Sequence, residues 1–197
     1  MAWAPDYITA EELAAYMRIT HDSDDVELAF AVSGASRAID YHCNRQFGIL
    51  AAPAERTYEA WFDCGRGLWV VDTDDYFGAL TAVTIGGVAT TAYTREPLNA
   101  ASVGMPYTSL TIDRAASVVP VTPLYLVAAT VAWGWTAVPD AVKLASRLQG
   151  SRFHSRRDSP FGVTGSPDQG GELRLLARVD PDVGVSLRDF VRPRYPR

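Results

Sequence analysis

The chain has 197 residues, of which 48% are hydrophobic and 21% charged, so its composition excludes a wholly disordered polypeptide and favours one domain, or one domain with an insertion. No uninterrupted apolar run approaches the ~20 residues that span a bilayer, and two cysteines are too few for a disulfide framework. The first residues lack the basic region of a secretory signal, so we expect a protein made in the cytoplasm without membrane contact.

The formal net charge of −5 hides an uneven distribution along the chain. Residues 1–142 contain seven Arg, no Lys, eleven Asp and six Glu, a formal charge of −10. Residues 143–197 contain ten Arg, one Lys, five Asp and one Glu, a formal charge of +5. Two interpretations remain open: a basic C-terminal part that is simply solvated, or one that binds an acidic partner or phosphate. The preference for Arg over Lys favours bidentate contacts with carboxylates.

Two helices are predicted near the N-terminus. Thr9 and Glu12 have the spacing of a capping box, which opens a short helix through Met17. A long amphipathic helix is predicted within residues 22–47, where Asp24 and Glu27 form a second candidate capping box and Asn44 can take the left-handed turn that ends a helix. The apolar face expected on the short helix is Leu13, Tyr16 and Met17, and the stripe expected on the long helix is Leu28, Val32, Ala35, Ile39 and Cys43.

The middle of the chain, residues 51–136, has the alternating pattern of strands and frequent turn residues. Gly86-Gly87 between two apolar runs is a strong signal for a two-residue hairpin. Residues 72–78 and 95–106 are predicted as loops. The pattern therefore predicts a small antiparallel sheet or sandwich. Its strands are expected at residues 56–61, 68–71, 80–85, 88–93, 109–113 and 125–133.

Helix is predicted again from Pro139, because proline suits the first helical position. Residues 158–171 are rich in Gly, Pro, Ser and Asp and are predicted as a long loop, and residues 172–179 fit either strand or helix. Asp180-Pro181 marks the start of a last helix, which Pro193 ends. The stripe expected to cover the long N-terminal helix is Ala141, Leu144, Ala145 and Leu148, and the last helix is expected to bury Val183, Leu187 and Phe190.

No catalytic, cofactor-binding or metal-ligating set is predicted. The three histidines lack the spacing of known zinc sites, and His42 and Cys43 point apart on a helix by ~100°. Cys64 lies in a turn and could be a reactive thiol, but no obvious base accompanies it, so no catalytic role is expected for it. The acidic run at residues 72–75 lacks the glycine and glutamate of an EF-hand, which leaves only a weak surface ion site as an alternative.

Two segments allow a binding interpretation beside a structural one. Trp133-Gly134-Trp135 fits an aromatic ligand platform, but two tryptophans around a glycine turn more often belong to a core, and we predict a core role between sheet and helix. The C-terminal arginines fit contacts with phosphate or with a partner protein, or simply the favoured end of a helix. The candidate partner or assembly residues are Arg152, Arg156, Arg157, Arg188, Arg192, Arg194 and Arg197.

These features together resemble the head-to-tail adaptors, or head–tail connectors, of long-tailed bacteriophages, especially those of actinobacterial hosts. The resemblance covers the two ends of the chain, and it rests on the order and spacing of motifs that are individually weak. At the N-terminal end they are ITAEEL at 8–13, MRI at 17–19, DSDD at 22–25 and YHCNRQF at 41–47. At the C-terminal end they are WGW at 133–135, the helix 141–148, SPFGV at 159–163, DPDV at 180–183 and residues 187–192.

The resemblance implies an α+β fold: a helical bundle built from residues 1–50 and 137–197, with an inserted antiparallel β-rich subdomain at 51–136. It implies no enzyme activity and no cofactor. Such a protein is expected in the virion neck as a ring, commonly twelvefold, that binds the portal protein and a stopper or tail-terminator protein while DNA passes through its channel. Two alternatives remain: a small ligand-binding or enzymatic domain, and a DNA-packaging or DNA-binding accessory protein, which would show strongly salt-dependent binding to duplex DNA.

Overall fold

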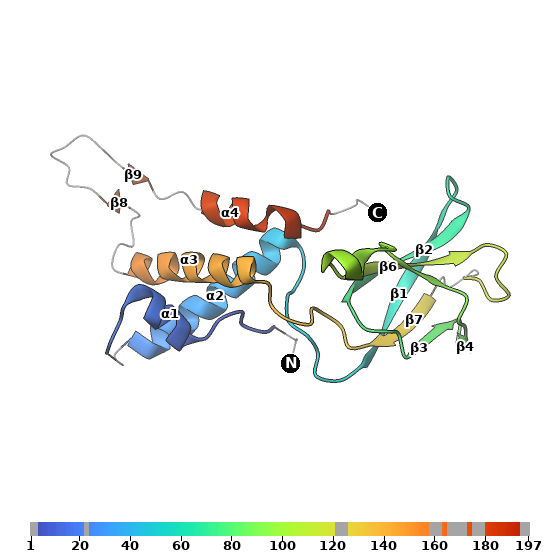
Figure 1. Cartoon of the computed structure of the whole chain (residues 1–197), viewed down its shortest axis with the longest axis horizontal. Coiled ribbons are helices and arrows are strands. Elements are labelled where there is room, and N and C mark those ends of the chain that lie inside the picture. The colour runs from blue at the N-terminus through green and yellow to red at the C-terminus, as the bar shows by residue number, and fades with distance from the viewer. Residues whose placement is uncertain are drawn as a thin grey trace. The chain divides into compact units, whose positions relative to one another are not determined.

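The computed structural model describes residues 4–21, 24–120, 126–157, 163–164, 173–174 and 180–193. The chain divides into two compact units. The helical unit comprises Met1–Phe47 and Val138–Arg197, and the sheet unit comprises Gly48–Ala137. Helices from both ends of the chain pack together in the first unit, and antiparallel strands make up the second (Figure 1). The predicted α+β class, with a β-rich insertion between helical segments, is confirmed.

Helix α1 (Ala10–Met17) begins as its sequence predicts. The Thr9 hydroxyl accepts a hydrogen bond from the backbone N–H of Glu12 at 3.2 Å, and the Glu12 carboxylate accepts one from the N–H of Thr9 at 3.0 Å. Leu13 is fully buried, whereas Tyr16, predicted for the same face, is 44% exposed. Tyr16 points about 100° away from the centre of the buried face in a helix with 3.6 residues per turn. That face consists of Ala10, Leu13, Ala14 and Met17.

Helix α2 (Asp25–Cys43) confirms the predicted long helix and its left-handed end at Asn44, which has φ 53°. Its predicted capping box is wrong. The Asp24 side chain caps no backbone N–H in the described part of the chain, because its carboxylate binds Arg157 instead. The buried face contains the whole predicted stripe. Its members are Leu28, Ala31, Val32, Ala35, Ser36, Ile39 and Cys43.

Helix α3 (Asp140–Arg157) begins within one residue of its predicted start but buries a different face. Leu144 is 46% exposed, and of the predicted stripe only Ala145 is buried. The buried face consists mostly of small and polar residues, which let α3 approach its neighbours closely. Ser146 satisfies its hydroxyl there by donating to the carbonyl of Val142 at 2.9 Å. The buried residues are Val142, Ala145, Ser146, Gln149, Gly150 and His154.

Helix α4 (Pro181–Leu187) continues into the 3₁₀ turn η4 (Arg188–Phe190) and confirms the predicted start. The Asp180 carboxylate accepts from the N–H of Asp182 at 2.9 Å, with Pro181 at the first helical position. Val183 and Leu187 are buried as predicted. The Phe190 ring is only half-buried, and it lies edge-on to Phe47 at 5.8 Å between centroids.

Between α3 and Asp180, the structure describes only two short strands. Strand β8 (Val163–Thr164) pairs with strand β9 (Leu173–Arg174) in antiparallel register. The rest of the predicted loop 158–171, and most of the ambiguous stretch 172–179, lie outside the described residues. Within the described part of the chain, no helix combines the length and apolar character that a membrane span requires.

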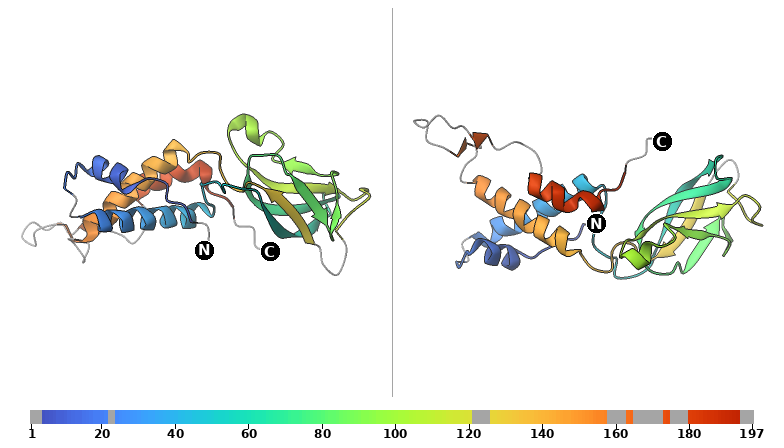
Figure 2. Two further views of the ribbon diagram at one scale, coloured as in Figure 1. Left: turned by 90° about the horizontal axis from the view of Figure 1, so that it is seen from below. Right: turned by 45° about the horizontal axis from the view of Figure 1, so that its top comes forward.

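The sheet unit contains a seven-stranded antiparallel sheet that curves into a half-barrel, in the order β4-β3-β7-β1-β2-β6-β5 (Figure 2). The Gly86-Gly87 turn between β3 and β4 is confirmed, with φ values of 56° and 84° that suit glycine. The predicted loop 95–106 instead holds part of one strand and a 3₁₀ turn, η2 (Ala100–Val103). The strands are β1 (Ala54–Asp63), β2 (Leu68–Tyr76), β3 (Ala82–Ile85), β4 (Val88–Ala89), β5 (Thr94–Glu96), β6 (Tyr107–Asp113) and β7 (Leu126–Val131).

The prediction of a loop at residues 72–78 is wrong, because β2 continues through Tyr76. Two of its acidic residues, Asp72 and Asp74, find partners on the neighbouring strand β1. Asp72 accepts from the indole N–H of Trp61 at 3.1 Å, and Asp74 accepts from the Tyr58 hydroxyl at 2.8 Å. The register shifts between Asp72 and Tyr76, as in a β-bulge. Paired carboxylates and a bulge therefore allow an acidic run to remain in a strand.

The predicted core role of the Trp133 motif is confirmed for Trp133, although this ring packs in the core of the sheet unit and not between sheet and helix. It is fully buried, its indole N–H donates to the Ala54 carbonyl at 2.7 Å, and Tyr58 and Tyr76 meet it edge-on at 5.5 and 5.7 Å. Gly134, at φ 107°, supplies the turn. The second tryptophan, Trp135, is also buried. Trp133 therefore belongs to the core of the sheet unit, and the Trp135 ring contacts Phe77 of the same unit.

Candidate functional site

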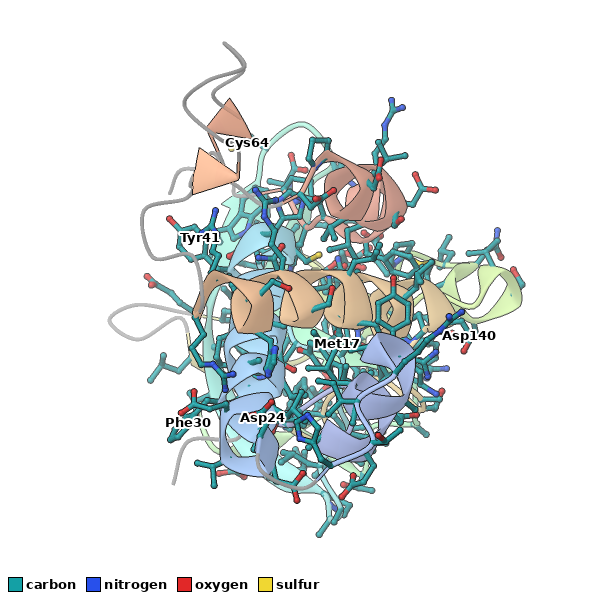
Figure 3. All side chains as sticks on the ribbon, turned by 90° about the vertical axis from the view of Figure 1, so that its left-hand side faces the viewer. Met17, Asp24, Phe30, Tyr41, Cys64 and Asp140 are labelled. Carbon is teal, nitrogen blue, oxygen red and sulfur yellow. The ribbon has the colours of Figure 1, made fainter. Side chains whose placement is uncertain are left out.

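The arginines of α3 bind carboxylates of the helical unit itself. Arg157 Nη1 lies 3.0 Å from Asp24 Oδ1, at the start of α2 and 133 positions away in the sequence. This hydrogen bond is the main reason that the pKa of Asp24 is lowered. His154 Nε2 lies 3.9 Å from the other Asp24 oxygen. Asp24 thus joins the beginning of α2 to the end of α3 (Figure 3).

Two further arginines of α3 make similar contacts. Arg152 Nη1 lies 3.3 Å from Asp180 Oδ2 at the start of α4, and Arg147 Nη2 lies 3.5 Å from Glu12 Oε1 of α1. The Arg152 side chain is only 16% exposed, whereas that of Arg147 is 36% exposed. Some of the positive charge of the C-terminal part is therefore neutralised by carboxylates of the N-terminal part within one copy of the chain.

The structure places the predicted assembly residues at several different positions. Arg152 and Arg157 belong to the internal ion pairs, Arg156 is half-buried, and Arg188 is exposed on η4. Arg192 donates its backbone N–H to the Cys43 carbonyl at 2.9 Å. The remaining two, Arg194 and Arg197, lie outside the described residues. A role of these arginines in assembly stays a prediction.

A network of polar side chains fixes the N-terminal arm on α2. The Tyr7 hydroxyl donates to Asp40 and accepts the backbone N–H of Phe47 at 3.1 Å. Arg37 Nε lies 3.1 Å from Asp40 Oδ2, and the Arg37 guanidinium also donates to the Pro5 carbonyl at 2.5 Å. Burial raises the pKa of both Tyr7 and Asp40. This network has a structural role, since its groups bind one another.

The solvent-exposed side of α2 carries large apolar and aromatic side chains, which were not predicted from the sequence. Val26, Phe30 and Tyr41 are 67%, 69% and 77% exposed, although all three are large and apolar or aromatic. Phe30 and Tyr41 lie along the same side of the helix (Figure 3). The spacing of four between Val26 and Phe30, displaced from the buried stripe, could have indicated a second apolar face. Large exposed apolar side chains that gather on one face are typical of interaction surfaces.

Phe30 also borders a pocket of about 240 Å³ between α2 and α3. Phe153 forms another wall, and its ring lies 3.5 Å from the position that a Cβ on Gly34 would occupy. The pocket combines apolar walls with charged groups. Its lining residues are Glu27, Phe30, Ala31, Phe153, His154 and Arg157.

Among the residues that the structure describes, the side chains that could hold a metal ion do not come together. Within the described part of the chain, no three His, Cys, Asp or Glu side chains form a group that could hold a metal ion. Cys43 is buried, and burial raises the pKa of its thiol to about 12, whereas Cys64 is exposed. Asp75, from the acidic run at residues 72–75, accepts from the Trp135 indole at 2.9 Å. Cys43 and Asp75 thus have packing or pairing roles.

Comparison with known proteins gives a match in fold. No family model matches the chain, and no curated protein matches it in sequence. Among solved structures, it is similar to a chain in a structure described as the neck of an empty GTA particle, computed with C6 symmetry. The similarity covers 100% of this chain and 95% of that chain, with a TM-score of 0.57 and 15% identity. At this identity the similarity shows a shared fold.

Proposed function

We propose that this chain is a structural, non-enzymatic subunit of the neck of a phage-like particle. The observation that carries the proposal is the full-length match to a chain from the neck of a GTA (gene transfer agent) particle, which includes both the helical ends and the sheet insertion. A shared fold alone does not assign a function, but two further features support the same conclusion. The motifs at both ends of the chain resemble head-to-tail adaptors, and α2 exposes large apolar side chains of the kind found at interfaces.

The finer proposal is an adaptor ring of the head-to-tail type, as the sequence resemblance implies. The C6 symmetry of the similar neck structure supports a cyclic arrangement, and a twelvefold ring is compatible with it because twelve is a multiple of six. In this proposal the ring lies below the portal, extends the DNA channel, and offers a surface to a stopper or tail-terminator protein. An actinobacterial host and the subunit number also belong to the proposal.

Imaging of intact particles tests the position of the chain. The Gly86-Gly87 turn is exposed, and nothing lies within 4 Å of a Cβ built at either glycine, so a short affinity tag inserted there can carry a gold label. Label at the collar between head and tail, with rotational symmetry in the averaged density, is the expected result. Label on the capsid shell or tail tip would contradict the proposal, as would catalytic turnover of a small molecule by the purified chain.

The C-terminal arginines provide a second test, of the proposed contact with the portal or a neighbouring subunit. Replacement of Arg192, Arg194 and Arg197 by Gln keeps the length of the chain and removes three charges. The variant is expected to lower the yield of tailed particles while leaving filled heads, because the C-terminal segment would no longer attract an acidic partner. Removal of residues 192–197 should have at least the same effect.

The control for this test is Arg114→Gln, which removes an exposed arginine of the sheet unit outside the proposed set. It is expected to leave the yield of tailed particles unchanged. A full yield from both the triple variant and the truncation would remove these three arginines from the proposal.

A further inference from the structure

The exposed face of α2 has a counterpart on α4. On α2, Glu27 and Phe30 are three residues apart and both exposed, with both of them lining the pocket. On α4 and η4, Val185 and Arg188 are also three residues apart and both exposed, Val185 to 76%. Residues at this spacing lie on the same side of a helix. Each pair therefore presents one apolar group and one charged group, in opposite order along the chain.

The two charged groups have opposite sign, and both remain available for a partner. Neither Glu27 nor Arg188 makes an ion pair or a side-chain hydrogen bond within the part of the chain that the structure describes. If the two helices approach in antiparallel orientation, Phe30 meets Val185 and Glu27 meets Arg188. In parallel orientation each charge would instead meet an apolar side chain. The order of residues thus selects one orientation.

The two faces do not meet within one copy of the helical unit. Phe30 and Tyr41 point to one side of α2, whereas α4, the red helix of Figure 1, lies toward the other side in the view of Figure 3. A cyclic ring of identical subunits requires two different, complementary patches on separate sides of each copy. The faces of α2 and α4 meet this requirement.

We propose that the α2 face of one copy binds the α4 face of the next copy in antiparallel orientation, with Val185 of the partner subunit at the Phe30 pocket. The inference rests on the proposed ring function and names its subunit contact. An apolar centre with a charged pair at its edge is the usual composition of a specific interface. The charged pair would mainly determine which surfaces meet.

Charge reversal tests the contact in the full-length chain. Glu27→Arg and Arg188→Glu are each expected to lower the fraction of subunits in rings by about tenfold, because like charges then face each other. The double variant, Glu27→Arg with Arg188→Glu, again places opposite charges across the contact and is expected to recover most of the assembly. The matched controls are Glu59→Arg and Arg114→Glu, which reverse exposed charges of the sheet unit and should leave assembly unchanged.

Ring formation is measured by sedimentation velocity and electron microscopy of the purified chain, and by the yield of tailed particles in cells if the purified chain stays monomeric. Circular dichroism checks that each variant folds. Disulfide trapping provides a second readout. With Cys64 changed to Ser and Cys43 buried, the double variant Glu27→Cys with Arg188→Cys is expected to give a ladder of covalent multimers under oxidation, and either single variant at most dimers.

Two results would overturn the inference and leave the proposed function standing. One is normal ring formation by both charge-reversed single variants. The other is a double charge-reversed variant that fails to recover assembly, together with cysteine variants that give no ladder. A wild-type chain that forms no ring, alone or in the particle neck, would overturn both the inference and the proposed function.

Discussion

Different interactions stabilise the interior of the helical unit and the interior of the sheet unit. In the helical unit, segments more than a hundred residues apart meet through small buried residues and through ion pairs such as Arg157–Asp24. In the sheet unit, the strands pack around large aromatic rings such as Trp133. The helical unit is therefore expected to be sensitive to added volume and to charge, and the sheet unit to lost volume.

The largest expected difference between the units is in thiol reactivity. Cys43 is buried in the helical unit, and a pKa raised from 9.0 to about 12 lowers its thiolate fraction near pH 8 by about a thousandfold relative to an unshifted thiol. Cys64, exposed at the β1–β2 turn, is expected to react with a disulfide reagent at once. The measurement is absorbance at pH 8, first in buffer and then in denaturant, with Cys64→Ser as control. Two thiols that react equally fast in buffer would show that the helical unit does not bury Cys43.

The same burial predicts a loss of stability in alkali. Above pH 9 the unfolded Cys43 thiol ionises, whereas the folded thiol stays neutral up to about pH 12. Its contribution to stability is therefore fully present below pH 9 and is lost as the pH rises toward 12. Urea midpoints at pH 8 and pH 11 measure the loss, which should be smaller in Cys43→Ala. An equal loss in the variant would assign the alkaline sensitivity to other groups.

Truncation of the central tryptophan tests the sheet unit. Trp133→Ala is expected to lower the free energy of unfolding by about 3–5 kcal/mol, because it leaves a cavity among aromatic rings and removes a buried hydrogen bond. Denaturation followed by near-ultraviolet circular dichroism measures the change. The control Trp61→Ala, at a side chain that is 47% exposed, is expected to cost less than about 1 kcal/mol. Equal losses would contradict the description of the core.

Added volume tests the close approach of helices in the helical unit. A Cβ at Gly150 of α3 would lie 3.1 Å from Leu13 Cδ2 of α1, so Gly150→Val is expected to lower the free energy of unfolding by about 1–3 kcal/mol. The matched control is Gly184→Val in α4, where nothing lies within 4 Å of the new Cβ. Urea denaturation of both variants gives the comparison. An unchanged midpoint for Gly150→Val would contradict the tight contact between α1 and α3.

The smallest expected effect concerns the Asp24 contact. The Arg157 hydrogen bond lowers the pKa of Asp24, so the contribution of this carboxylate to stability is present above the unfolded pKa of about 3.9 and is lost as the pH falls through the lower, folded pKa. Asp24→Asn is therefore expected to lower the melting temperature slightly at pH 7, and the difference should shrink as the pH falls below the unfolded pKa. A difference that stays constant over the whole acid range would mean that the amide disturbs packing instead of charge.

Local sequence signals predicted where helices and turns begin and end more successfully than which side of a helix is buried. The Thr9 capping box, the Asn44 helix end and the Gly86-Gly87 turn depend on neighbours in sequence, and the structure has all three. The buried face of α3 was predicted wrongly because Leu144 is more apolar than Gly150, although only a small residue fits against Leu13.

Two other features show the same limit of local signals. The Asp24 cap was predicted wrongly because its competing partner, Arg157, comes from the far end of the chain. The exposed Phe30 was not predicted as part of a candidate interface, since the buried stripe of α2 satisfied the helical period by itself. Whether a second apolar face is covered depends on which helices pack beside it.

By itself, the sequence determined the class of fold, the order of most helices and strands, and the resemblance that supports the proposed function. Capping, periodicity and turn chemistry act over a few residues, so they can be interpreted without knowing the fold. Only the tertiary structure decided which arginines of α3 are paired and which side of α2 stays exposed. Those outcomes depend on which distant segments meet, because packing and charge compensation act through space and not along the chain.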